Sequence, residues 1–175
     1  MRERYVVDTN VLIAASAGCP TNSKDIDATP DDPQLRLKVW VWLSKFQESN
    51  SRLVLDTDNK IYEEYNSRLG FNDFGLQMVI HKWSTAAVDN VEVLYDVDGY
   101  GILPESLRTV IHDNDDKKMV AAAVESHKYY NEGCIAFASD TDWHDWESEL
   151  YSNNILVEPI IEEWSREKHA EKQAR

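Results

Sequence analysis

The sequence predicts a single α/β domain built on a parallel β-sheet. Apolar runs of four to five residues alternate with longer stretches of helical period, which is the pattern of strands joined by helical crossovers. The chain has 175 residues, enough for one compact domain with a substantial core. No internal repeat or low-complexity linker divides it. We therefore expect one domain over residues 1–175, with a core in 4–158 and a C-terminal helix in 159–175.

The N-terminal half is expected to form two strands and four helices. Tyr5–Val7 is an apolar strand that ends at Asp8, and a short helix over 11–15 follows at once with Thr9 or Asn10 as its cap. A polar loop precedes Pro33, which suits the first position of a helix capped by Asp32. The other segments of this half are a helix to about Glu48, a strand at 52–55, a helix at about 57–69 and a helix near 76–86.

The C-terminal half continues the alternation of strands and helices. The helix from Asp116 to about Tyr130 carries alanines that allow close packing on a sheet. The other segments are a strand at 91–94, a short helix at 104–111, a strand at 134–138, a helix near 143–151, a strand at 155–157 and a charged helix from Pro159.

The charge balance restricts the function. Lys and Arg number 18 against 32 Asp and Glu, so the net charge is −14. A protein that grips nucleic acid by neutralising phosphates should be basic, which argues against a DNA-binding protein that works without metal. A nuclease is still allowed, because divalent cations in an acidic pocket reverse the local sign of the charge.

Cysteine usage and hydropathy predict a cytoplasmic protein. Cys19 and Cys134 lie far apart without CxxC spacing, so we expect reduced thiols and neither a zinc site nor a disulfide. The N-terminal residues 1–4 run into a short apolar stretch without a small-residue cleavage site, so we expect no secretory signal. No apolar run approaches the roughly 20 residues that span a bilayer, and we expect no membrane partner.

Acidic residues recur just past the ends of the predicted strands. Asp8 follows the first strand, and Asp140 follows the fourth with Asp142 two residues later. Glu64 lies about two turns into the helix after the second strand, and Asp116 begins the helix that leads into the fourth. Sites in open α/β sheets form outside the carboxyl ends of the strands. We therefore expect carboxylates from four separate segments to meet in one pocket.

Such a pocket favours a hard divalent cation. Carboxylates held close together repel, so some stay protonated without a positive ion among them. Oxygen-only ligands favour Mg²⁺ or Mn²⁺ over Zn²⁺, and such ions activate water and clamp a phosphodiester for in-line displacement. Taken singly, each acid also has a simpler explanation. Asp8 and Asp116 are alternatively helix caps, Glu64 is one of two glutamates on a solvated helix face, and Asp140 and Asp142 alternatively belong to a turn.

Four stretches of the chain resemble, in order, the motifs of PIN-domain nucleases. Their hallmarks are an acid after the first strand, a Glu in the second motif, a DxxD stretch leading into an Ala-rich helix, and a final Asp after a small or hydroxyl residue. The corresponding stretches here are VVDTNVLI at 6–13, IYEEY at 61–65, DNDDKKMVAAA at 113–123 and ASDTD at 138–142. The resemblance covers residues 5–142 and selects Glu64 over Glu63 and Asp116 over Asp113.

The resemblance implies a three-layer α/β/α sandwich and an endoribonuclease that depends on Mg²⁺ or Mn²⁺. It implies catalytic and metal-binding roles for Asp8, Glu64, Asp116 and Asp140, an auxiliary metal ligand in Asp142, and orienting hydrogen bonds from Asn10 and Ser139. RNA is then the substrate, and a homodimer or a toxin that pairs with an antitoxin protein is the further implication. The helices near 34–48 and 76–86 are candidates for that surface, and core burial explains their apolar residues equally well.

Two other classes of function remain open. A non-catalytic binding module, or an acidic mimic of nucleic acid, could keep the fold and the acids. An acidic Mg²⁺-binding signalling domain would need an Asp ending the third strand and a Lys after the fifth, where this chain has Asp96 and Glu158. Trp143 and Trp146 could stack on RNA bases or pack in the core, and His112 beside Asp113 is the one histidine that could reach the site.

Overall fold

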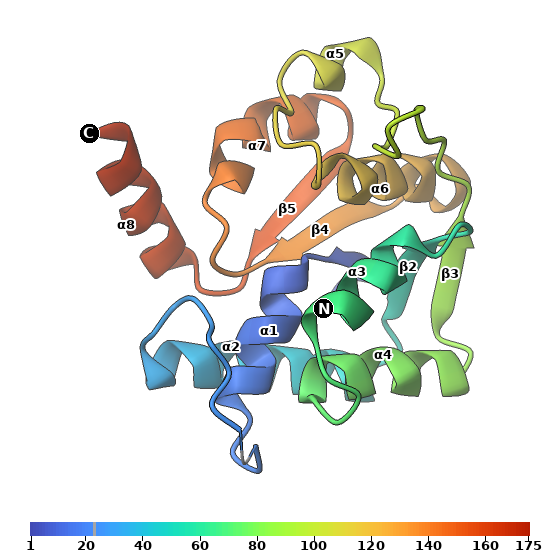
Figure 1. The fold of residues 1–175 in the computed structure, drawn as a ribbon. Helices are drawn as coiled ribbons and strands as arrows, with labels where there is room; N and C mark the ends of the chain where they lie inside the picture. Colours follow the sequence, from blue (N-terminus) through green and yellow to red (C-terminus); the bar gives the residue numbers. More distant parts are fainter. Residues whose placement is uncertain (23) are drawn as a thin grey trace.

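The protein is described by a computed structural model over residues 1–22 and 24–175, and it is built on one five-stranded sheet (Figure 1). The strand order is β3-β2-β1-β4-β5, and all four strand pairings are parallel. The strands are β1 (Arg4–Val7), β2 (Arg52–Asp56), β3 (Val88–Val91), β4 (Gly133–Phe137) and β5 (Ile155–Pro159). The prediction of an α/β fold with a central parallel sheet is confirmed.

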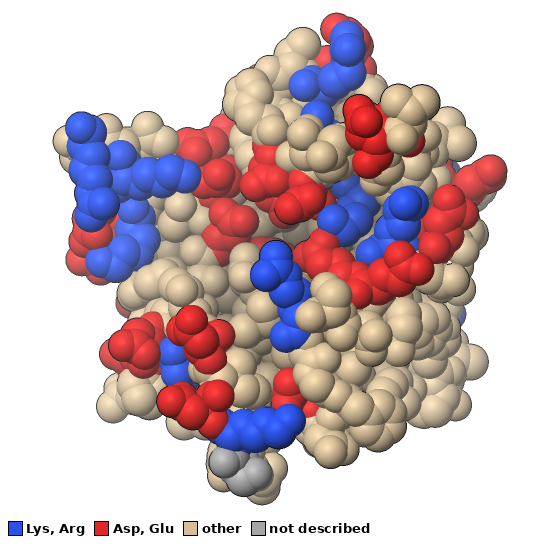
Figure 2. All heavy atoms as spheres, viewed as in Figure 1, with Lys and Arg blue, Asp and Glu red and all other residues tan. Residues whose placement is uncertain are grey.

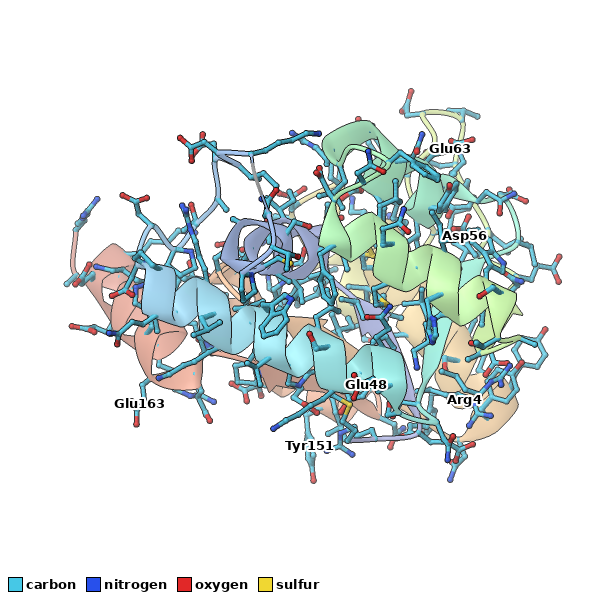
Figure 3. All side chains as sticks on the ribbon, turned by 90° about the horizontal axis from the view of Figure 1, so that it is seen from below. Arg4, Glu48, Asp56, Glu63, Tyr151 and Glu163 are labelled. Atoms are coloured by element: carbon cyan, nitrogen blue, oxygen red, sulfur yellow. The ribbon has the colours of Figure 1, made fainter. Side chains whose placement is uncertain are left out.

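Helices cover both faces of the sheet, as the three-layer sandwich requires. On one side α1 packs against α2 and α4, and on the other α6 lies on β4, β1 and β2 while α7 lies along β5 (Figure 1). The view from below shows α2 and α4 crossing the first of these faces (Figure 3). The helices are α1 (Thr9–Gly18), α2 (Pro33–Glu48), α3 (Lys60–Arg68), α4 (Phe74–Ser84), α5 (Glu105–Arg108), α6 (Lys117–Tyr130), α7 (Asp142–Ser152) and α8 (Glu162–Gln173).

The core explains why these strands read as continuous apolar runs. β1 and β4 lie in the middle of the sheet, and every residue of β4 is buried, as are Tyr5, Val6 and Val7 of β1. Strands covered on both faces lose the alternation of apolar and polar residues. Between the helices, Gly75 lets α4 approach α1, because a Cβ there would lie 2.6 Å from the backbone oxygen of Leu12.

The third strand was predicted in the wrong place. The sequence suggested residues 91–94, but the strand is Val88–Val91, and Val91 alone belongs to both. β3 is an edge strand that pairs with β2, with Val88 opposite Leu53. Its second residue is Asp89, a charged side chain that interrupts the apolar pattern expected of a strand. Asp89 is compensated by charge, because Arg4 Nε and Arg52 Nε donate to its Oδ2 at 2.9 Å and 2.8 Å. Figure 3 places Arg4 at the edge of the molecule where the strands begin.

The C-terminal helix begins later than predicted. It runs from Glu162 and not from Pro159, because β5 continues through Pro159, which pairs opposite Phe137. Proline is tolerated there, since β5 is an edge strand. The helix therefore occupies less of residues 159–175 than the sequence suggested.

Two helix starts also differ from the prediction, and both involve an Asp at a strand end. The cap of α1 is Asp8 and neither Thr9 nor Asn10, because Asp8 Oδ1 accepts the backbone N–H of Asn10 at 3.2 Å. The helix expected from residue 57 begins at Lys60, where Asp56 accepts the backbone N–H groups of Lys60 and Ile61 at 3.0 Å and 2.9 Å. The predicted cap of α2 by Asp32, followed by Pro33, is confirmed.

No helix among the described residues is both long enough and apolar enough to cross a membrane.

Candidate active site

The site lies where the strand order reverses, between β1 and β4. From β1 the chain proceeds outward to β2 on one side, whereas β4 and β5 lie on the other. Such a switch point opens a crevice at the carboxyl ends of the strands. Asp8 directly follows β1, and its backbone N–H donates to Ala136 O of β4 at 2.9 Å. Asp140 comes shortly after the end of β4, so the two acids flank the same crevice.

Glu64 and Asp116 reach this crevice from α3 and α6. Asp116 directly precedes α6, and its side chain makes no capping hydrogen bond to that helix. Burial is the largest cause of the raised pKa of Asp116, and the negative charges of Asp8, Asp140, Asp113 and Glu64 raise it further, so these carboxylates lie near one another. We call Asp8, Glu64, Asp116 and Asp140 the acid cluster. In Figure 2, acidic side chains gather in a hollow at the centre of the face shown, with the basic residues of α8 at its left edge.

Asp8 is held by hydrogen bonds on both carboxylate oxygens. Its side chain is almost fully buried, with the residue 3% exposed. Oδ1 caps α1 through the backbone N–H of Asn10, and Oδ2 accepts the indole N–H of Trp143 at 3.1 Å. Each carboxylate oxygen has a second lone-pair direction, so both can still accept from the crevice. Asp8 therefore both caps α1 and belongs to the acid cluster, so the two roles that the sequence offered for it are compatible.

Glu64, and not its neighbour Glu63, belongs to the cluster. Glu64 Oε1 accepts a hydrogen bond from the hydroxyl of Thr9, and its Oε2 forms an ion pair with Lys118 Nζ at 2.5 Å. Its charge also raises the pKa values of Asp8 and Asp116. Glu63 is exposed, and Figure 3 shows it on the outside of the molecule above Asp56.

Asp140 and Asp142 are linked through the start of α7. Asp140 Oδ1 accepts the backbone N–H of Asp142 at 2.9 Å, and the carboxylate of Asp142 is bound by the ammonium of Lys172 from α8. The orienting roles implied for Asn10 and Ser139 need correction. Asn10 acts through its backbone N–H, and the side chain of Ser139 makes no hydrogen bond to an acid among the described residues.

The cluster disfavours its own ionisation. Burial first, and then the charge of Asp140, raise the pKa of Asp8 to about 7, while the N–H groups of Asn10 and Trp143 oppose the rise. Burial and the charges of Asp8 and Asp140 raise the pKa of Asp116 to about 9. Burial also raises the pKa of Asp140, and the ammonium of Lys172 counteracts it. Near neutral pH at least one carboxyl group of the cluster therefore stays protonated.

The donor chemistry of the cluster fits a hard divalent cation. All its groups are carboxylates, which Mg²⁺ and Mn²⁺ prefer, and positive charge would relieve the repulsion that raises the pKa values. The side chains do not form a finished cage, however. Within residues 1–22 and 24–175, no three His, Cys, Asp or Glu side chains are arranged to hold one ion. Part of the positive charge comes from the chain itself, through Lys118 on Glu64 and Lys172 on Asp142.

A cavity of about 360 Å³ opens beside the cluster. His112, Asp113, Asp142 and Gln173 are among its lining residues, so His112 lies next to the site but makes no hydrogen bond to an acid among the described residues. A wider cavity of about 580 Å³ lies at the opposite edge of the sheet, where Arg2 and Gly133 precede or begin the strands. It contains none of the predicted site residues.

Sequence reasoning missed the contacts that four residues make to the acids: Thr9, Lys118, Lys172 and Trp143. Trp143 had a signal, because a buried indole N–H needs an acceptor. Trp143 is fully buried and packs edge-on against Trp146, with ring centroids 5.3 Å apart, so the core explanation for both rings is confirmed over base stacking. Lys172 had none, since its partner lies 30 residues away.

The two positions at which a phosphoacceptor site would need an Asp and a Lys make other contacts here. Glu158, the residue after the fifth strand's apolar run, accepts hydrogen bonds from Tyr5 Oη at 2.6 Å and Trp42 Nε1 at 3.1 Å. Asp96 lies in a loop beyond β3 and accepts the backbone N–H groups of Asp98 and Tyr100. None of these hydrogen-bond partners belongs to the acid cluster.

No protein-family model, no curated protein and no solved structure matches this chain. The resemblance to PIN-domain nucleases therefore stays a prediction from the four motifs.

Proposed function

We propose that the protein is an endoribonuclease that hydrolyses RNA phosphodiester bonds at the acid cluster with Mg²⁺ or Mn²⁺. The observation that carries the proposal is the convergence of four carboxylates from four segments at the switch point of a parallel sheet. Their mutual repulsion, expressed in the raised pKa values of Asp8 and Asp116, is what a divalent cation would remove. The choice of RNA over DNA rests on the motif resemblance alone.

The roles of the residues follow from their contacts. Asp8, Asp116 and Asp140 would hold the cation, with Glu64 beside them and Asp142 as an auxiliary ligand. When bound, such a cation supplies an activated water and neutralises charge on the phosphate during in-line displacement. Trp143 and the N–H of Asn10 fix the orientation of Asp8, and Lys118 with Thr9 fixes that of Glu64. Groups held in this way lose little freedom when substrate binds.

The net charge supports dependence on metal. A chain with a net charge of −14 repels a polyanion, so RNA would approach productively only when cations reverse the sign at the cluster. An antitoxin partner or a homodimer belongs to the proposal as an implication of the resemblance. Co-purification and the mass of the full chain in solution test it.

The direct test is cleavage of labelled single-stranded RNA and DNA with Mn²⁺, Mg²⁺ or EDTA. We expect RNA cleavage that EDTA abolishes. In Asp8→Asn and Asp116→Asn the cleavage rate should fall by more than roughly 10–100-fold, which is the loss typical of substitutions outside the metal ligands. Asp115→Asn is the matched control, because Asp115 is exposed beside Asp116 and is not among the main causes of the raised pKa values of Asp8 or Asp116. Equal cleavage by Asp8→Asn and wild type would reject the site.

A non-catalytic binding module is the second candidate, favoured by the absence of a finished ligand cage among the described residues. It predicts RNA binding without cleavage under every metal condition. Gel-shift assays on the same samples separate the two functions.

A further inference from the structure

The C-terminal helix α8 is attached to the body mainly by polar contacts. Figure 1 shows it beside α7, outside the two helical layers that cover the sheet. Ser165 is its one buried residue, and Trp164 adds a partly buried ring. Such an element contributes little apolar burial, so its attachment belongs to the low-stability end of the fold.

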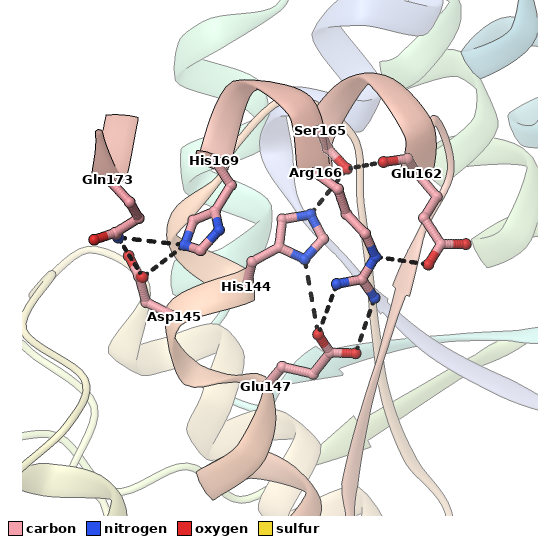
Figure 4. A network of polar contacts seen from close by, with 8 residues as sticks. All are labelled: His144, Asp145, Glu147, Glu162, Ser165, Arg166, His169 and Gln173. Carbon is pink, nitrogen blue, oxygen red and sulfur yellow. Dashed lines mark hydrogen bonds and ion pairs between the residues drawn. The ribbon is translucent and has the colours of Figure 1, made fainter. Parts of the chain in front are cut away.

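The polar contacts join α8 to the first turns of α7 (Figure 4). There are three kinds of contact: a histidine–serine hydrogen bond, an arginine–glutamate ion pair, and two hydrogen bonds to one carboxylate oxygen of Asp145. They are His144 Nε2 with Ser165 Oγ at 2.9 Å, Arg166 with Glu147 at 3.3 Å, and Asp145 Oδ1 with His169 Nε2 at 2.7 Å and Gln173 Nε2 at 2.8 Å. The contacts of Arg166, His169 and Gln173 lie at the surface, where such pairs are individually weak and are screened by salt. The His144–Ser165 bond is buried.

One further contact joins α8 to Asp142, the residue whose backbone N–H donates to Asp140 of the acid cluster. The ammonium of Lys172 binds the carboxylate of Asp142, and its charge also acts on Asp140. The other basic side chains of α8 behave differently. Arg166 pairs with Glu162 and Glu147, and Lys168 pairs with Glu171, so both cations form ion pairs with glutamates outside the acid cluster.

The position of Lys172 makes it a competitor for metal. An ammonium on a carboxylate oxygen occupies a site that a divalent cation would use and lowers the negative potential around it. Gln173, the next residue, lines the same cavity as Asp113 and Asp142, so this end of α8 lies against Asp142 on the side of that cavity.

We propose that α8 is an autoinhibitory arm: its docking on α7 places Lys172 on Asp142, and its release frees that carboxylate and strengthens divalent-cation binding at the acid cluster. The inference rests on the metal site of the proposed function but not on the identity of the substrate. Release requires that the surface contacts and the buried His144–Ser165 bond break and that Trp164 leaves its partly buried place. A partner or polyanion that binds the basic side chains of α8 would supply the free energy for it.

The first experiment measures Mn²⁺ affinity of the full chain by calorimetry and by electron paramagnetic resonance. We expect Lys172→Met to bind Mn²⁺ about fivefold more tightly than wild type, which is the upper range for loss of one exposed ion pair. Lys168→Met is the matched control, because it removes an equal charge from the same helix without touching the cluster. Equal or weaker binding by Lys172→Met overturns the proposal.

The second experiment releases the arm while Lys172 stays in place. The double variant His169→Ala/Gln173→Ala removes both contacts of α8 to Asp145. We expect faster hydrogen exchange of the amides at 162–173 together with tighter Mn²⁺ binding. Slow exchange in this variant, or fast exchange without a gain in affinity, overturns the arm.

The outcomes separate this inference from the proposed function. Tighter Mn²⁺ binding in both variants without RNA cleavage by any of them supports the arm and rejects the ribonuclease. Metal-dependent RNA cleavage with unchanged Mn²⁺ affinity in both variants supports the ribonuclease and rejects the arm.

Discussion

Trp143 donates its indole N–H to Oδ2 of Asp8 at 3.1 Å, across a separation of 135 residues. The contact joins the first turn of α7 to the end of β1, so the helix that carries Asp142 also orients Asp8. Both groups are buried, and a buried carboxylate that loses a donor bears the full cost of its desolvation. The indole is therefore a positioning group for the acid cluster as well as a core side chain.

Trp143→Phe should destabilise the protein more than Trp146→Phe. Both substitutions remove the same volume from neighbouring buried rings, but only the first removes a hydrogen bond to a buried carboxylate. We expect an additional loss of about 1–3 kcal/mol in the free energy of unfolding, measured by urea denaturation. The extra loss should be largest near pH 8, where Asp8 is ionised above its pKa of about 7, and smaller at pH 5. Equal losses in the two variants at both pH values would contradict it.

Asp116→Asn should stabilise the metal-free protein at high pH. Folding raises the pKa of Asp116 from 3.8 to about 9, so between these values the folded state holds a proton that the unfolded state has lost. The contribution of Asp116 to stability therefore falls as pH rises through that window. Asn keeps the shape without the charge, and no hydrogen bond from the side chain of Asp116 caps α6.

The measurement for Asp116 is the thermal midpoint in EDTA from pH 5 to pH 9. The wild-type midpoint should decline more steeply than that of Asp116→Asn, and Asp115→Asn should follow the wild type. Parallel curves for Asp116→Asn and wild type would show that Asp116 is ionised without cost.

The sheet could be predicted because its central strands are buried on both faces. Tyr5–Val7 and the run at 134–138 contain no polar residue, and their length suits strands. β3 could not be placed in the same way, because its interior Asp89 is neutralised by Arg4 of β1 and Arg52 of β2. A charge compensated by side chains distant in sequence leaves no local periodicity to detect.

The acids of the site were predictable from their positions at strand ends, but their partners were not. Parallel strands bring their carboxyl ends to one edge, so Asp8 and Asp140 had to lie close once β1 and β4 are neighbours. The positions of the Lys118 and Lys172 ammonium groups depend on the orientation of α6 and α8, which is set by tertiary packing. The sequence therefore indicated where negative charge gathers and gave no sign of the lysines that offset it.

Lys82→Met should lower the stability of the protein and abolish the pH dependence that Lys82 contributes. Lys82 is buried and donates to the backbone oxygens of Ser49 and Ser51 at 2.9 Å and 2.7 Å, beyond the end of α2. Methionine keeps the length but leaves both carbonyls without this donor, and we expect a loss of about 2–3 kcal/mol. Lys45→Met, at an exposed position near the end of α2, is the control.

The pH dependence of Lys82 has the opposite sign to that of Asp116. Burial lowers the pKa of Lys82 from 10.5 to about 8, so above pH 8 the folded state loses a proton that the unfolded state keeps. Its contribution to stability rises with pH through this window. Urea denaturation from pH 7.5 to 10 should show that rise in wild type and its absence in Lys82→Met. A rise of equal size in both would assign the effect to another group.

Glu64→Gln and Glu63→Gln form the sharpest matched pair, because the two residues are adjacent and only one reaches the cluster. Glu64 binds Thr9 and Lys118, whereas Glu63 is exposed. If the cluster hydrolyses RNA, Glu64→Gln should reduce the rate by about 100-fold or more, and Glu63→Gln by less than about twofold. Glutamine keeps an acceptor for Thr9 but loses the charge that pairs with Lys118, so folding should survive in both variants. Rates measured at saturating Mn²⁺ separate a loss of metal from a loss of chemistry. The reverse ranking would move the site to the outer face of α3 and remove Glu64 from it.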